Sequence, residues 1–185
     1  MSITANPAAG RRFNIWRIIG WGGAVALVLA PLVVMQFTTN VNWDETDFLF
    51  AAVIFGIVGG LIELAVRTSA NWYFRFGWVF AVLAGFVVIW SNLAVGMIGN
   101  EDNPINLWFG AVLLVAIAGS VASRFFRSIL SAAMFTAGSV QAAIGIFAGI
   151  LGIDPRGGIF TIMLSSAWFI SSLLFWCAHR SGASQ

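Results

Sequence analysis

The residues best suited to chemistry in this chain lie in one short polar segment, NEDNPIN, at residues 100–106. It places two carboxylates, Glu101 and Asp102, among three asparagines, whereas the chain on either side is almost entirely apolar. Oxygen-bearing side chains so close together could bind a small cation or a polar solute. They could also serve only to turn the chain, because Asn103 followed by Pro104 is typical of a helix start.

Two other segments carry the same kind of helix-start signal. In IDPRG, Asp154 stands at the cap position and Pro155 follows it. In NWDETDF, Asp44 can cap a helix, and Asp47, three residues later, can complete a reciprocal capping box with it. Carboxylates at these positions also interact favourably with the positive end of the helix dipole. Capping therefore accounts for most of the acidic residues.

Some polar residues exceed what capping requires. Glu101, Asp102 and the nearby Asn92 could line an acidic outer vestibule together with Asp44 and Asp47. Such oxygen ligands suit calcium or magnesium, but the spacing is not that of an EF-hand loop. We therefore predict no metal and no cofactor, while a structural turn and a site for a solute or a partner both remain open interpretations.

Two further polar residues lie inside apolar runs. Gln141 falls at the middle of the run 128–152, where it could bridge two helices or line a polar pocket, and it is the single residue most expected to contact a solute. Glu63 is followed four residues later by Arg67, a spacing that favours an ion pair near the membrane surface.

The residue inventory excludes several functional classes. The chain has no lysine for a retinal Schiff base, and its single histidine, His179, cannot supply a bis-histidine haem site. Its single cysteine, Cys177, excludes an intramolecular disulfide. No G-x-S-x-G pattern or nucleophile–base set is visible, so we predict that the protein is not an enzyme. A net charge of +2 does not suggest a nucleic-acid partner.

The composition indicates that membrane helices position these residues. Of the 185 residues, 60% are hydrophobic and 9% are charged, whereas a soluble domain carries about a quarter charged residues. A spanning helix needs about 20 predominantly apolar residues. We therefore predict an all-α polytopic membrane protein with a single transmembrane domain over 1–185. The six expected helices are at about 15–37, 47–66, 76–98, 105–123, 128–152 and 157–178.

The charges predict an orientation for these six helices. Eight of the nine arginines would lie on one side of the membrane and six of the seven acids on the other, with Arg156 as the exception among the arginines. Because cytoplasmic loops carry the excess of basic residues, both termini are expected in the cytoplasm. The bilayer is thus the first expected partner of this multi-pass protein.

One part of the chain resembles a known family. The runs NLAVG (92–96), IG (98–99), EDNP (101–104) and NL (106–107) resemble a segment of uncharacterised small six-helix bacterial inner-membrane proteins. The resemblance implies a bacterial inner membrane and a helix count, but no mechanism. Size and helix number are also similar to those of the membrane substrate-binding components of energy-coupling vitamin transporters, without a matching motif.

Two functions remain as predictions. The first is the binding or transport of a small polar or cationic solute that enters from the outer face and meets Asn92 and Gln141. The alternative is an accessory or assembly subunit of a larger membrane complex, or a homo-oligomer, that packs through small residues. A seam of such residues is expected on the fifth helix at Gly138, Ala142, Gly145, Gly149 and Gly152, either for packing inside the bundle or for contact with a partner.

Overall fold

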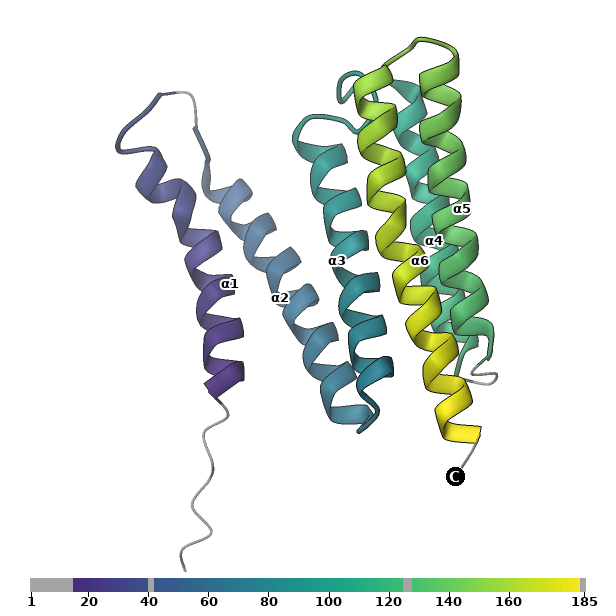
Figure 1. Ribbon diagram of the computed structural model, residues 1–185. Helices are drawn as coiled ribbons and strands as arrows, with labels where there is room; N and C mark the ends of the chain where they lie inside the picture. Colours follow the sequence, from purple (N-terminus) through teal and green to yellow (C-terminus); the bar gives the residue numbers. More distant parts are fainter. Residues whose placement is uncertain (1–14, 40–41, 125–127, 184–185) are drawn as a thin grey trace, which may run out of the picture. The chain divides into compact units, whose positions relative to one another are not determined.

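The computed structural model describes residues 15–39, 42–124 and 128–183, and within these ranges the chain is helical and has no strand. Six helices in this part of the chain are long and apolar enough to cross a membrane, as predicted. The elements are α1 (Ile15–Val34), α2 (Glu45–Thr68), α3 (Trp72–Ala94), the 3-10 helix η1 (Pro104–Trp108), α4 (Phe109–Ala122), α5 (Ser128–Ile150) and α6 (Pro155–Ala183) (Figure 1). Arg11, Arg12 and Arg127, which the orientation argument uses, lie outside the described residues.

The helix boundaries differ from the predicted ones for local reasons. The third helix starts at Trp72, earlier than predicted, because the side chain of Asn71 accepts hydrogen bonds from the N–H groups of Tyr73 (2.9 Å) and Phe74 (3.3 Å). It ends at Ala94, and Gly96 then adopts a φ of 76°, a left-handed conformation that favours glycine. Local capping chemistry therefore sets both ends of α3.

The chain divides into two compact units, Met1–Gly59 and Gly60–Gln185. In the first unit Trp21 of α1 packs on Gly59 of α2, where an added Cβ would lie 3.0 Å from the indole ring. The second unit contains the end of α2 and all of α3 to α6. The single domain predicted over 1–185 stays a prediction.

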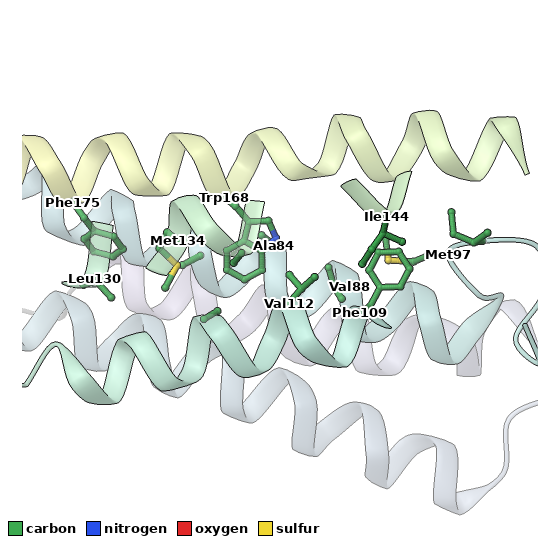
Figure 2. Packing of buried hydrophobic residues seen from close by; sticks show 14 of the residues in the cluster. Ala84, Val88, Met97, Phe109, Val112, Leu130, Met134, Ile144, Trp168 and Phe175 are labelled. Atoms are coloured by element: carbon green, nitrogen blue, oxygen red, sulfur yellow. The ribbon is translucent and has the colours of Figure 1, made fainter. Parts of the chain in front are cut away.

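The second unit has an apolar core between its helices. In this unit α6 packs against α5 and α3, and α5 also packs against α4. Figure 2 shows the buried side chains that meet there, among them Trp168 and Phe175 of α6, Phe109 of α4 and Met134 of α5. Many outward-facing side chains are apolar as well, which is the pattern expected where lipid rather than water covers a surface.

Glycines bring α5 and α6 close together. A Cβ on Gly145 would lie 2.7 Å from the carbonyl oxygen of Gly158, and a Cβ on Gly138 would lie 3.0 Å from the Cβ of Trp168. The predicted seam is therefore confirmed at Gly138 and Gly145. The backbone of Gly149 still approaches α6, since a Cβ on Gly158 would lie 3.3 Å from the Gly149 nitrogen, but Gly149 is itself exposed on its Cβ side. Gly152 lies beyond the helix with a φ of 65°.

Alanine at two glycines of α5 should have opposite effects on stability. At Gly149 an added Cβ meets no atom within 4 Å. Gly149→Ala should therefore raise the free energy of unfolding by about 0.5–1 kcal/mol, because glycine is a poor helix former. Gly145→Ala should lower it by about 1–3 kcal/mol, because the Cβ presses on the backbone of α6. Denaturant unfolding in detergent micelles measures both, and equal effects would contradict the close helix contact.

Candidate functional site

The acids at the start of α2 form a reciprocal cap. Oδ1 of Asp44 accepts hydrogen bonds from the N–H groups of Thr46 (2.8 Å) and Asp47 (3.0 Å). In return, Oδ2 of Asp47 accepts one from the N–H of Asp44 (3.0 Å). This is the predicted capping arrangement, with aspartate in place of the usual glutamate. Both acids thus have a structural role at this helix start.

The other two predicted caps are also confirmed. Oδ1 of Asn103 accepts a hydrogen bond from the N–H of Ile105 (3.0 Å), and Oδ1 of Asp154 accepts one from Gly157 (2.9 Å). Asp154 has a second role, because its Oδ2 accepts a hydrogen bond from the N–H of Gly99 (2.8 Å). The bonds from Gly157 and then Gly99 lower the pKa of the Asp154 carboxyl below its ordinary value. The loop after α3 is thereby attached to the start of α6.

The loop between α3 and η1 folds around one side chain, that of Asn106. Its Oδ1 accepts hydrogen bonds from the N–H groups of Met97 (3.1 Å) and Ile98 (2.9 Å). Its Nδ2 donates to the carbonyl oxygens of Ile98 (3.2 Å) and Asn100 (2.7 Å). An added Cβ on Gly96 would lie 2.8 Å from this Nδ2, so glycine is required there. Much of the polar segment therefore stabilises its own turn.

The remaining residues of the predicted vestibule differ in their surroundings. Glu101 and Asp102 are exposed and make no hydrogen bond or ion pair with another described residue. The Nδ2 of Asn92 donates to the carbonyl of Val88 (2.8 Å), while its Oδ1 is buried without a partner in the described part of the chain. Asp44 and Asp47 belong to the other compact unit, so a vestibule formed by all five residues stays a prediction.

Gln141 lies fully buried between α5 and α6. Its Nε2 donates to the carbonyl oxygen of Thr161 (3.2 Å), and its Oε1 accepts from the indole N–H of Trp168 (2.9 Å). Four hydroxyl groups on α5 and α6 could have joined Gln141, but each donates instead to a carbonyl of its own helix. They belong to Thr136, Ser139, Ser165 and Ser166. The observed contacts of Gln141 are thus hydrogen bonds between helices, and its contact with a solute stays a prediction.

An open groove lies between α5 and α6 in the second unit. It is located near the start of α5 and the end of α6. Its volume is about 680 Å³. The rings of Phe135 and Phe169 meet at its deep end, with their centroids 5.4 Å apart. The lining residues are Ser128, Ser131, Ala132, Phe135, Thr136, Phe169, Ser172, Leu173, Trp176 and His179.

The hydroxyl groups inside this groove are satisfied by the protein. Ser131 and Ser172 each donate to the other's carbonyl oxygen at 2.8 Å, and Thr136 donates to a carbonyl of α5 at 3.0 Å. Ser128 and His179, at the mouth, make no hydrogen bond with any residue that the structure describes. The groove is therefore apolar along its walls, and the polar side chains in its lining that bond no described residue, Ser128 and His179, lie at its mouth.

An arginine lies beside this mouth. The guanidinium of Arg180 stacks 3.9 Å from the ring centroid of Trp176, and Trp176 lines the groove. Stacking of this kind contributes about 0.5–1 kcal/mol at an exposed site, which favours this placement of the guanidinium. The mouth therefore combines a positioned cation with two hydrogen-bonding groups.

Sequence reasoning missed this groove. Its lining residues recur every three or four positions on both helices, which is the spacing of one helix face. However, α5 and α6 are apolar on most faces, so their sequences do not tell which faces meet each other and which meet lipid.

Comparison with known proteins adds no relative. No protein-family model, no curated protein and no solved structure matches this chain. The resemblance to small bacterial inner-membrane proteins stays a prediction.

The hydrogen bond between Gln141 and Trp168 can be tested with a double-mutant cycle. Gln141→Leu and Trp168→Phe should each lower the free energy of unfolding by at least about 1 kcal/mol, because each leaves a buried partner unsatisfied. The double variant should lose less than the sum, with a coupling of about 0.5–1.5 kcal/mol, typical of such bonds between membrane helices. Strictly additive losses in detergent unfolding would contradict the contact.

The attachment of the loop at Asp154 should depend on pH. Because the pKa of this carboxyl is lowered on folding, its contribution to stability is fully present above about pH 4 and is lost as the pH falls through the folded pKa. Asp154→Asn keeps one of the two acceptor oxygens, so it should cost roughly 1 kcal/mol at neutral pH and less in acid.

Hydrogen exchange at the Gly99 amide and unfolding between about pH 7 and pH 3 would measure this effect. Asp102→Asn is the matched control, since Asp102 lies in the same loop and bonds no described residue. Slow exchange at Gly99 in Asp154→Ala, which removes both acceptor oxygens, would contradict the attachment.

Proposed function

We propose that this chain is a non-enzymatic, multi-pass protein of a bacterial inner membrane that binds one membrane amphiphile in the groove between α5 and α6. The observation that supports the proposal is the distribution of polar groups in that groove. Its inner hydroxyls are bonded within the protein, whereas Ser128 and His179 at the mouth are not bonded to described residues. A molecule with an apolar chain and a polar head matches that distribution.

The size of the groove fits a single lipid chain. Its lining runs from Ser128 to Thr136 on α5 and from Phe169 to His179 on α6. At 1.5 Å per residue these stretches span roughly 12 Å and 15 Å. One leaflet contributes about half of the ~30 Å hydrocarbon thickness, which is nearly the same depth. The volume of about 680 Å³ also lies within the range of sites that hold one small molecule.

The arginines support an orientation for this groove. Arg180 lies near the end of α6, Arg75 near the start of α3 and Arg124 just after α4, all at the end of the unit where the groove opens. The excess of basic residues on cytoplasmic loops favours placing this end in the cytoplasm, together with both termini. In this orientation the ligand would enter from the inner leaflet.

The predicted pathway for an outer solute has less support than the groove. Such a pathway needs polar groups that face a cavity between Glu101, Asp102 and Gln141. Both polar ends of Gln141 bond to groups of α6, so the solute would have to displace contacts inside the helix pair. The alternative role as an accessory subunit stays a prediction.

Filling the groove should remove the bound lipid. Ala132 lines the groove on α5, so Ala132→Phe should occupy the space of the acyl chain, whereas Ala143→Phe places the same side chain at an exposed position outside the groove. Native mass spectrometry in mild detergent, with phospholipid added, counts the retained lipids. We expect the wild type and Ala143→Phe to keep one lipid that Ala132→Phe loses, with unchanged helix content by circular dichroism. Equal retention by all three proteins would refute the proposal.

A further inference from the structure

We infer that the groove selects an anionic phospholipid, whose phosphate binds at the mouth to the guanidinium of Arg180, with Ser128 and His179 as hydrogen-bond donors. The inference rests on the proposed function, because it names the headgroup of the molecule whose chain would lie in the groove. It is carried by the charge and the geometry of the mouth.

Arg180 is positioned for this role and has no competing carboxylate. Its guanidinium lies over the ring of Trp176, and no ion pair joins it to any acid in the described ranges. A guanidinium that stacks on a ring keeps its N–H groups in its own plane, where they can donate to phosphate oxygens. Trp176 also lines the groove, so one lipid molecule could place its phosphate at Arg180 and its acyl chain in the groove.

The charges around the mouth are not balanced by acids. The turn between α2 and α3 is joined to the end of α6, because Nδ2 of Asn71 donates to the hydroxyl of Ser181 at 2.9 Å. Near this turn the acid present is Glu63, and it pairs with Arg67 at 2.6 Å. The remaining acids that the structure describes lie at the opposite helix ends. A negative headgroup would therefore complement this end of the unit.

The headgroup must provide most of the selectivity. An acyl chain that enters the groove leaves an equally apolar lipid environment. The hydrophobic effect therefore does not favour the binding of one lipid class over another. An arginine at the membrane surface, in contrast, discriminates by charge. A basic side chain near an anionic surface contributes roughly 1 kcal/mol, which corresponds to about a five-fold difference in affinity.

The matched pair Arg180→Gln and Arg75→Gln tests this inference. Both variants remove one positive charge from the same end of the unit and one cation–π contact, since the guanidinium of Arg75 lies 5.2 Å from the ring centroid of Trp72. Arg180 stacks on Trp176, which lines the groove, whereas Arg75 stacks on Trp72, which does not. Arg75 also donates from Nε to the carbonyl oxygen of Ser69 (2.7 Å), so unchanged helix content by circular dichroism is checked for both variants. Native mass spectrometry would compare retention of phosphatidylglycerol and phosphatidylcholine with identical chains by each protein.

We expect the wild type and Arg75→Gln to retain phosphatidylglycerol about five-fold or more over phosphatidylcholine. Arg180→Gln should lose this preference but still retain phosphatidylcholine. Arg180→Lys should recover part of the preference, because it restores the charge without the planar donor geometry. Excess glycerol phosphate should not displace the lipid.

Other outcomes would overturn the inference in distinguishable ways. If the wild type holds both lipids equally and Ala132→Phe loses both, the proposed function stands and the headgroup inference fails. If no lipid is retained, both fail. Equal losses in Arg180→Gln and Arg75→Gln would indicate diffuse charge attraction rather than a site. Displacement by glycerol phosphate would indicate a site for a soluble phosphate compound.

Discussion

The hydrocarbon of a bilayer offers no hydrogen-bond partner, so polar groups inside a membrane helix pair are stabilised when the protein satisfies them. The buried Oγ1 of Thr161 is an exception in this helix pair, since it has no partner in the described part of the chain. Two sets of contacts between α5 and α6 provide this stabilisation. Gln141 bonds to the carbonyl of Thr161 and the indole of Trp168, and the Ser131–Ser172 pair exchanges two hydroxyl-to-carbonyl bonds. Both sets fix the same two helices in one register. The core of the second unit and the groove depend on that register.

The same need for hydrogen-bond partners explains why the acidic and amide side chains at the helix starts look like a binding site in the sequence. Helix starts leave unpaired N–H groups, and Asp44, Asn103 and Asp154 accept hydrogen bonds from them. Asp154 also uses its second oxygen to hold the loop after α3 through Gly99. The capping oxygens of Asp44, Asn103 and Asp154 are thus already bonded, whereas Glu101 and Asp102 stay exposed.

Features that depend on neighbouring residues were predictable, and those that depend on distant ones were not. The six helices follow from apolar run length, and the caps follow from Asn–Pro, Asp–Pro and Asp-x-x-Asp spacing. The bond between Gly99 and Asp154 joins residues 55 positions apart, and that between Asn71 and Ser181 joins residues 110 apart. No local sequence pattern predicts such pairs. The groove was missed for a related reason, since helices that are apolar on most faces do not reveal which faces meet.

The groove itself follows from the sizes of the side chains along the helix pair. Toward one end, Gly145 and Gly158 let the two backbones approach until an added Cβ would meet a carbonyl oxygen. Toward the other end, the Ser131–Ser172 pair still joins the two helices, and the larger side chains of Phe135, Phe169 and Trp176 line the open groove with it. Because the serine hydroxyls are already bonded, a hydrocarbon chain can lie against them without leaving a polar atom unsatisfied.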